Sequence, residues 1–165
     1  MPNNQVPSIN PIPEHGQTVT PRLVVGDGAA AIDFYQRAFG AEETGERFSS
    51  PDGTVIHAEV RIGSSIVMIT GETADVVAPA RSPAPLGGVV TAIMATYWEN
   101  VDAAWERAVS AGAEVVYPLA DQFYGERGGR LRDPFGQQWM LSQRVEDVSP
   151  EEMNLRAARF FSSPT

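Results

Sequence analysis

The chain lacks cysteine and long apolar runs, and these absences exclude several classes of protein. Without cysteine there is no disulfide framework, no thiolate nucleophile and no zinc-finger site. No stretch approaches the roughly 18 apolar residues that a membrane-spanning helix requires. The first residues hold neither a basic segment nor an apolar run, so we expect no secretory signal and a cytoplasmic location.

Positive charge is also scarce. The 165 residues, the length of one domain, include 12 basic and 21 acidic side chains, which gives a net charge of −9. This balance repels nucleic-acid phosphates and anionic lipid head groups, so we expect no nucleic-acid partner and no membrane partner. A small anionic ligand stays possible, because a local arginine cluster can outweigh a distant surface field.

One pattern occurs twice along the chain. Residues 27–42 read D-G-A-A-A-I-D-F-Y-Q-R-A-F-G-A-E, and residues 100–114 read N-V-D-A-A-W-E-R-A-V-S-A-G-A-E. The offset is 73 between Asp27 and Asn100 and 72 between Gly40 and Gly112, so one gap aligns them. Two similar units that each bury one face are expected to pack together and leave a shared cleft for a ligand.

The predicted elements repeat in the same order around this pattern. We expect strands at 18–25, 42–49, 54–62 and 65–70 with a helix from Asp27 to Gly40, then strands at 89–98, 114–118, 127–132 and 137–143 with a helix at 100–111. The predicted fold is α+β, with two tandem βαβββ modules whose curved mixed sheets surround a cleft. A single domain at 18–144 then contains module one at 18–71, a linker at 72–88 and module two at 89–144.

Two further segments lie outside this domain. Residues 1–17 are rich in proline and predict an N-terminal arm. Residues 145–165 predict a helical extension, because Ser149 can cap a helix with Pro150 at its first position. This helix could brace its own domain, contact a second chain or cover the cleft.

The strand at residues 55–62 carries polar side chains on one face. Alternation directs Ile56, Ala58, Val60 and Ile62 toward the helix, and His57, Glu59 and Arg61 toward the cleft. An imidazole can take up a proton near neutral pH, so His57 could act as a general base with Glu59 beside it. His57 could also bind a metal or simply form the wall, and the three side chains could be a solvated charge ladder.

The segment 121–127, D-Q-F-Y-G-E-R, concentrates polar handles and flat rings. Gln122, Phe123, Tyr124 and Arg127 are the types of side chain that a ligand-recognition loop uses. The alternative is a bulged hairpin crossing that an internal arginine and aspartate pair holds together.

The duplicated unit, the H-A-E triplet at 57–59, the segment 121–127 and the D-P-F-G turn at 133–136 together resemble the vicinal oxygen chelate superfamily. This is the group of glyoxalases, bleomycin-resistance proteins and extradiol dioxygenases, and the resemblance covers about residues 18–144. It implies paired βαβββ modules and a homodimer whose pockets are completed across chains.

Enzymes of this superfamily bind one divalent metal through His or Glu on the first and last strands of their modules. The corresponding positions here read Thr20, Thr70, Ile93 and Met140, none of which is a strong metal ligand. The resemblance therefore implies a protein without a metal or other cofactor. A lyase, isomerase or dioxygenase that uses one divalent metal and a small oxygenated substrate is the alternative.

Metal-free members of the superfamily bind antibiotics in the cleft and sequester them. By this resemblance we expect a binding protein for an aromatic or partly anionic small molecule, acting in resistance or in the handling of a secondary metabolite. The expected wall residues, besides the segment 121–127, are Arg22, Arg61, Met68, Ile93, Tyr97 and Met140. Methionine adapts to irregular ligands and arginine stacks on flat ones.

Overall fold

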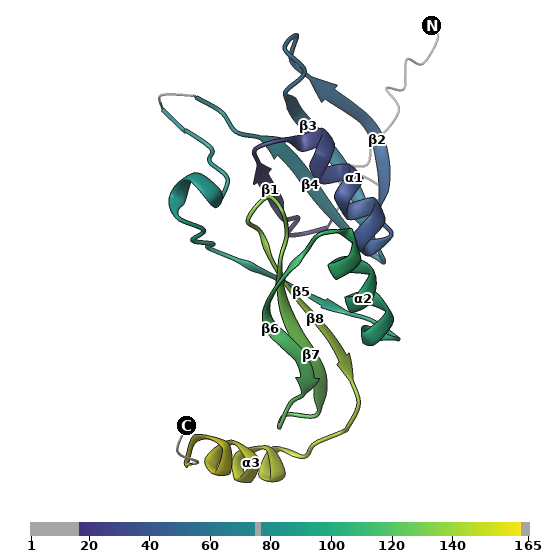
Figure 1. Ribbon diagram of the computed structural model, residues 1–165, viewed down its shortest axis with the longest axis vertical. Coiled ribbons are helices and arrows are strands. Elements are labelled where there is room, and N and C mark those ends of the chain that lie inside the picture. The colour runs from purple at the N-terminus through teal and green to yellow at the C-terminus, as the bar shows by residue number, and fades with distance from the viewer. Residues whose placement is uncertain (1–16, 75–76, 163–165) are drawn as a thin grey trace, which may run out of the picture.

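The computed structural model describes residues 17–74 and 77–162, and within them the βαβββ unit occurs twice (Figure 1). The first unit comprises β1 (Arg22–Val25), α1 (Gly28–Phe39), β2 (Glu42–Ser49), β3 (Val55–Ile62) and β4 (Ser65–Gly71). The second comprises β5 (Ile93–Tyr97), α2 (Val101–Ala111), β6 (Glu114–Asp121), β7 (Glu126–Arg132) and β8 (Gln138–Arg144). A short 3-10 helix, η1 (Ala84–Leu86), lies in the linker, and α3 (Pro150–Ser162) follows the second unit. The α+β prediction is confirmed, and the predicted N-terminal arm lies outside the described residues except for Gln17.

Each unit forms a four-stranded mixed sheet with the same strand order. The orders are β1-β4-β3-β2 and β5-β8-β7-β6, and the first strand of each unit runs parallel to the last. The strands β1 and β5 begin later than predicted, at Arg22 and Ile93, and β6 extends to Asp121. None of the helices in the described part of the chain is long and apolar enough to cross a membrane.

Equivalent local signals start and end the two long helices. The Asp27 carboxylate accepts a hydrogen bond from the Ala30 amide at 3.0 Å, and Asn100 accepts one from Ala103 at the same distance. Gly40 and Gly112 then end the helices in the left-handed conformation that glycine adopts without strain. The repeated caps therefore explain why both helices follow their first strands in the same way.

Each sheet has a helix face and an open face. On the helix face of the first sheet, Ala58, Val60, Val67 and Ile69 are buried against α1. The strand pairing places Arg22, Thr44, Phe48, His57, Glu59, Arg61 and Met68 on its open face. In the second sheet, the open face carries Ile93, Ala95, Tyr97, Tyr117, Gly128, Arg130, Arg132, Met140 and Ser142.

A β-bulge overturns one prediction for β3. Ile56 was expected to face the helix with Ala58, but it is 52% exposed while Val55 is buried. The pairing register shifts here, because Phe48 is opposite His57 and Ser49 is opposite Val55. The displaced Ile56 carbonyl accepts hydrogen bonds from the Arg22 guanidinium at 3.0 Å and the Thr70 hydroxyl at 2.9 Å.

The two modules meet through their helices, which lie side by side (Figure 1). Tyr35 and Phe39 of α1 pack on Trp139 of β8, with ring centroids 5.3 and 4.6 Å apart. Phe135, in the turn between β7 and β8, packs edge-on against Phe34 at 6.1 Å. These aromatic contacts join both modules into one hydrophobic core.

A buried carboxylate lies within this aromatic junction. Asp133 is 3% exposed, and its Oδ2 accepts hydrogen bonds from the Tyr35 hydroxyl at 2.8 Å and the Trp139 indole N–H at 2.9 Å. Its Oδ1 accepts from the backbone amides of Phe135 and Gln137, both at 2.9 Å. The side-chain amide of Gln137 donates to the Val24 carbonyl at 2.8 Å, which fixes the same turn against β1. The junction is therefore specified by polar as well as apolar contacts.

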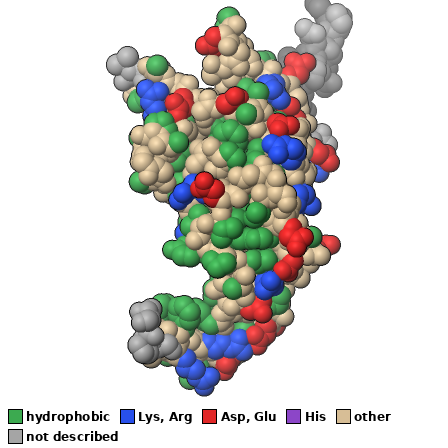
Figure 2. Space-filling model, viewed as in Figure 1, with side chains coloured by type: hydrophobic (Ala, Val, Ile, Leu, Met, Phe, Trp, Pro, Cys, Tyr) green, Lys and Arg blue, Asp and Glu red, His purple; other side chains and the backbone are tan. Residues whose placement is uncertain are grey.

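Helix α3 projects beyond the second module. The Ser149 hydroxyl accepts from the Glu152 amide at 3.2 Å, which confirms the predicted start. Phe160 packs on Phe123 in the β6–β7 turn at 4.9 Å, and Arg156 pairs with Glu146 at 2.6 Å. No described residue of α3 is fully buried. Figure 2 shows a hollow between α3 and the second module, with hydrophobic side chains along the inner side of the helix. These contacts agree with a brace, whereas a role in dimerisation or as a cover stays a prediction.

Replacing Asp133 with asparagine is expected to destabilise the whole domain. The asparagine amide would present N–H donors to the hydroxyl, indole and backbone donors that now surround the carboxylate, which leaves buried groups unpaired. We expect Asp133→Asn to lower the free energy of unfolding by about 3 kcal/mol, measured by urea denaturation. Asp147→Asn, at an exposed aspartate, is the matched control and should change it by less than about 0.5 kcal/mol.

The pH dependence of the free energy of unfolding, compared between wild type and Asp133→Asn, gives a second test whose direction can be predicted. Burial raises the pKa of Asp133 above its ordinary value, so above about pH 4 the folded state holds a proton that the unfolded state has released. The contribution of Asp133 to the free energy of unfolding should therefore fall as the pH rises above about 4. The free energies of unfolding of wild type and Asp133→Asn should then become more similar, because asparagine does not titrate. A difference that widens with pH would contradict this account.

Candidate functional site

The open face of the first sheet brings together five of the predicted site residues. Arg22, Met68 and Glu59 lie in one row across β1, β4 and β3. His57 and Arg61 flank Glu59 on β3, and the His57 Nε2 lies 3.4 Å from the Glu59 Oε1. Arg61 pairs with Glu42 on the neighbouring strand.

This arrangement can position or exchange a proton but has few metal donors. His57 and Glu59 are each about one-third exposed, so a ligand on this face can reach both. The Phe48 ring lies with its centroid 6.4 Å from the His57 imidazole and extends the face as a flat apolar surface. An imidazole, a carboxylate and an aromatic ring therefore lie within one short stretch of the sheet.

The open face of the second sheet holds three more of the predicted residues, Ile93, Tyr97 and Met140. The Tyr97 hydroxyl donates to a Glu126 carboxylate oxygen at 3.0 Å, and this contact raises the pKa of Tyr97. Arg130 was not predicted as a site residue. Its guanidinium carbon lies 5.2 Å from the centre of the Tyr117 ring. Alternation along β7 is the signal that could have found it, since Gly128, Arg130 and Arg132 share this face.

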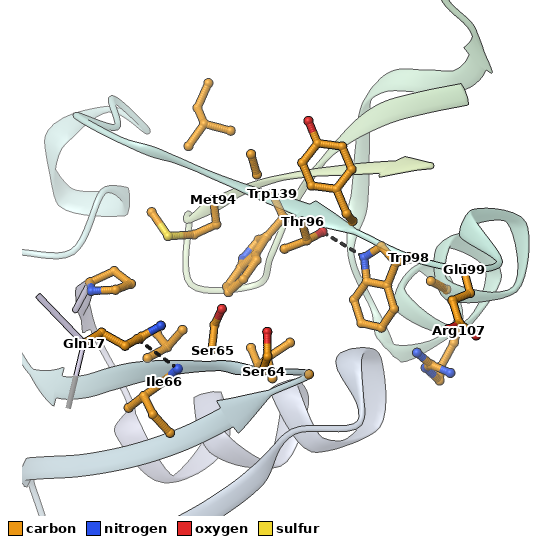
Figure 3. Close-up of a pocket in the computed structure, with 18 of the residues that line it drawn as sticks. Gln17, Ser64, Ser65, Ile66, Met94, Thr96, Trp98, Glu99, Arg107 and Trp139 are labelled. Atoms are coloured by element: carbon orange, nitrogen blue, oxygen red, sulfur yellow. Dashed lines mark hydrogen bonds between the residues drawn. The ribbon is translucent and has the colours of Figure 1, made fainter. Parts of the chain in front are cut away.

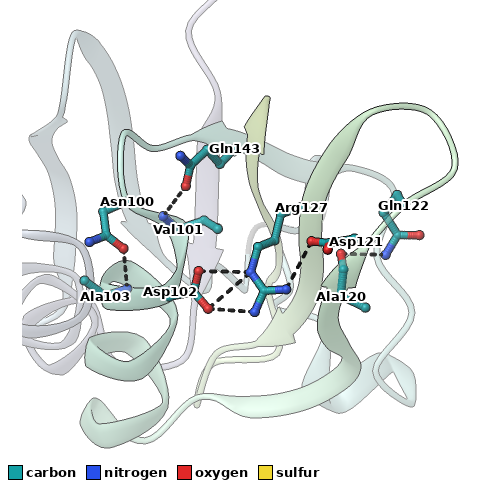
Figure 4. A network of polar contacts seen from close by, with 9 residues as sticks. All are labelled: Asn100, Val101, Asp102, Ala103, Ala120, Asp121, Gln122, Arg127 and Gln143. Atoms are coloured by element: carbon teal, nitrogen blue, oxygen red, sulfur yellow. Dashed lines mark hydrogen bonds and ion pairs between the residues drawn. The ribbon is translucent and has the colours of Figure 1, made fainter. Parts of the chain in front are cut away.

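The predicted recognition segment 121–127 has a different environment. Arg127 donates three hydrogen bonds to Asp102 of α2, at 3.2, 2.9 and 2.7 Å, and one to Asp121 at 3.2 Å (Figure 4). The Arg127 guanidinium lowers the pKa of Asp102 through these bonds. The contacts join α2 to the β6–β7 hairpin, as the alternative interpretation of a hairpin held by an arginine and aspartate pair describes.

The other three predicted site residues of this segment, Gln122, Phe123 and Tyr124, also make contacts or are partly buried within the chain. The Gln122 amide donates to the carbonyls of Ala120 and Gly128, both at 3.2 Å. Phe123 supports α3, and burial raises the pKa of the Tyr124 hydroxyl. A ligand contact by any of these residues stays a prediction.

A cavity of about 870 Å³ lies between the modules, beside the free edge of β5. Ser64 of the β3–β4 turn and Ser65 at the start of β4 lie on one side of it, with Thr96 and Trp98 on the other (Figure 3). The Trp98 indole donates to the Thr96 hydroxyl at 2.8 Å. Of the predicted site residues, only Ile93 and Tyr97 reach this cavity, so it is distinct from most of both open faces.

The residues at the superfamily's metal positions do not fit a divalent cation. Ile93 and Met140 carry no oxygen or nitrogen donor, and the Thr70 hydroxyl is bonded to the Ile56 carbonyl. Thr20 precedes β1 and offers a single hydroxyl. Within residues 17–74 and 77–162, no three His, Cys, Asp or Glu side chains are grouped so that they could hold a metal.

Comparisons with known proteins agree with this architecture. Residues 16–141 match the model of the glyoxalase/bleomycin resistance protein/dioxygenase superfamily. An uncharacterized protein of Mycobacterium tuberculosis is 43% identical over 136 residues, which cover 82% of this chain and 79% of that protein.

Solved structures show the same fold. TioX from Micromonospora sp. ML1 superposes with a TM-score of 0.61 at 28% identity, over 79% of this chain and all of that one. A glyoxalase/bleomycin resistance protein/dioxygenase from Nocardioides gives a TM-score of 0.59 at 24% identity, over 81% of this chain and 87% of that one. On the extent of the family match and the duplicated βαβββ architecture, this chain belongs to the glyoxalase/bleomycin resistance protein/dioxygenase superfamily.

Proposed function

We propose that this protein binds a flat, partly anionic small organic molecule on the open faces of its sheets, without a metal, and sequesters or carries it. An antibiotic or another secondary metabolite has this chemistry. The observation that carries the proposal is the exposure of aromatic side chains on these faces. Tyr97 is 66%, Tyr117 60% and Phe48 58% exposed in the chain.

Exposed rings of this kind are costly unless something covers them. An aromatic side chain buries a large area when it stacks on a flat ligand, and its hydroxyl still offers a polar contact. Met68 lies between Arg22 and Glu59 on the first face, and Met140 lies beside Arg130 on the second, where a flexible thioether adapts to an irregular outline. The faces therefore combine stacking surface, adaptable apolar surface and separate polar groups, as ligand sites do.

The donor set supports binding without a metal. On the first open face His57 and Glu59 are the nearest pair of metal-ligating groups, and one imidazole with one carboxylate is too few for a stable site. The same pair favours a second candidate function. A lyase, isomerase or dioxygenase could use His57 as its base and Glu59 to orient it.

We also propose that a second copy of the chain covers the open faces. The first sheet presents the exposed ring of Phe48, and the second presents the exposed rings of Tyr97 and Tyr117. These rings would be buried if the first sheet of one chain faced the second sheet of the other. The ligand would then lie between two sheets that come from different chains.

The binding proposal is testable with a neutral flat probe, 2-naphthamide. We expect wild-type protein to bind it saturably in isothermal titration calorimetry, and Phe48→Ala, at an open-face residue that does not line the cavity, to weaken binding about tenfold, because a stacking surface is lost. Phe161→Ala removes another exposed ring, from α3, and should leave the affinity unchanged. Equal losses in both variants, or no saturable binding, would contradict the proposal.

Metal content is the control for this experiment. We expect protein purified without chelator or affinity tag to hold far less than one metal per chain by elemental analysis, and the probe affinity to be the same with and without EDTA. Near-stoichiometric metal that disappears in His57→Ala would instead make a metal-dependent enzyme the leading function.

The dimer proposal predicts twice the chain mass in sedimentation equilibrium. Phe48→Glu places a charge on the first open face and should shift the protein toward monomer, because the carboxylate would have to be buried in the interface. Phe161→Glu makes the same change on α3 and should leave the dimer intact. The reverse pattern would assign dimerisation to α3, and a monomeric wild type would exclude the dimer.

A further inference from the structure

The sequence has no lysine, so arginine supplies every one of its 12 basic side chains. Ion pairs within the chain occupy most of the arginines that the structure describes. Eight have a carboxylate within 4.0 Å, namely Arg37, Arg47, Arg61, Arg81, Arg127, Arg132, Arg144 and Arg156. Arg22 and Arg107 have no such carboxylate but donate to the carbonyls of Ile56 and Ala38. Arg130 differs from all of these.

Arg130 has neither an ion pair nor a hydrogen bond to any described residue. Its described contact is with the Tyr117 ring, and its Nε is buried without a partner. The side chain is only partly exposed, so water satisfies it incompletely. A partly buried guanidinium without a carboxylate or a full set of hydrogen bonds destabilises the isolated chain. Its presence on an ordered strand therefore points to an anionic partner outside the chain.

A second unpartnered polar group lies on the same face. Ser142 is 1% exposed, and its hydroxyl is buried without a hydrogen bond in the described structure. It is paired with Gly128, where a Cβ would come within 2.9 Å of the Ser142 Oγ. Ser142 and Arg130 are therefore two polar side chains on one open face that each have an atom buried without a hydrogen-bond partner in the described structure.

The Tyr117 ring lies on one side of this guanidinium, with its centre 5.2 Å from the guanidinium carbon. A guanidinium that stacks on a ring is held by one flat side while its edge keeps N–H donors free. Those donors form a fork that matches the two oxygens of a planar carboxylate. The Nε of Arg132, two residues along the same strand and on the same face, is also buried without a partner, but Arg132 has a carboxylate oxygen of Glu114 3.6 Å from its Nη1, so its charge is already paired.

We propose that Arg130, oriented by Tyr117, is the residue that recognises a carboxylate on the ligand, whose aromatic body lies along the neighbouring open face. This inference rests on the proposed binding function and makes its ligand class specific: an aromatic carboxylate. The protein has a net charge of −9, which repels anionic ligands. An arginine without a carboxylate partner is therefore a position where an anionic ligand is attracted rather than repelled.

The test compares 2-naphthoate with 2-naphthamide, which share one ring system and differ in charge. Binding of each is measured by isothermal titration calorimetry to wild type, Arg130→Gln and Arg132→Gln. The two variants make the same change in net charge on one face, so general electrostatics affects them equally. Circular dichroism and thermal unfolding confirm that each variant is folded.

We expect wild type to bind 2-naphthoate about tenfold or more tightly than 2-naphthamide, since a charge-assisted hydrogen-bond pair is added. Arg130→Gln should remove this preference and leave the 2-naphthamide affinity unchanged, whereas Arg132→Gln should keep the preference. Equal affinity for the two probes in wild type, or equal effects of the two variants, would overturn the role of Arg130 alone. Failure of both probes to bind wild type would contradict the proposed function and this inference with it.

Discussion

The buried carboxylate of Asp133 is the contact on which the arrangement of the molecule depends. It accepts hydrogen bonds from Tyr35 of the first module and from Trp139 of the second, while its own turn supplies two backbone donors. Burial alone would make this carboxylate unfavourable, and the four donors that offset part of this cost surround it only when both modules occupy their observed positions. The modules therefore meet on the helix side of their sheets, around Asp133. The open faces of the sheets take no part in this junction and can contact a ligand or a second chain.

Two arginines of β7 show how this arrangement separates structure from recognition. Arg127 donates to Asp102 of α2 and to Asp121 of β6, and these bonds join the helix to the hairpin. Arg130 lies three residues further on, on the open face, with an aromatic ring and no carboxylate. The same type of side chain thus has a structural role on one face and, in our proposal, a ligand-binding role on the other.

The fold could be predicted from the sequence because its signals are local and occur twice. Asp27 and Asn100 cap both helices as expected. The bulge at Ile56 could not be predicted in this way, because it depends on donors from β1 and β4 that lie far away in sequence. The sequence also does not show which carboxylate Arg127 pairs with, because its partner Asp102 is 25 residues away in the chain. Alternation along β7 places Arg130 on the open face with Gly128 and Arg132, but the denser polar and aromatic side chains of residues 121–127 are the stronger sequence pattern and predict a recognition loop there.

The central claim is that ligands bind on the open faces rather than in the cavity between the modules. Methionine methyl groups report on this directly, because Met68 and Met140 lie on the open faces whereas Met94 lines the cavity. We would titrate methyl-labelled protein with 2-naphthoate and follow these signals by nuclear magnetic resonance. The account predicts that Met68 and Met140 shift together with one dissociation constant while Met94 stays constant. A shift of Met94 without Met68 and Met140 would place the ligand in the cavity and contradict the account.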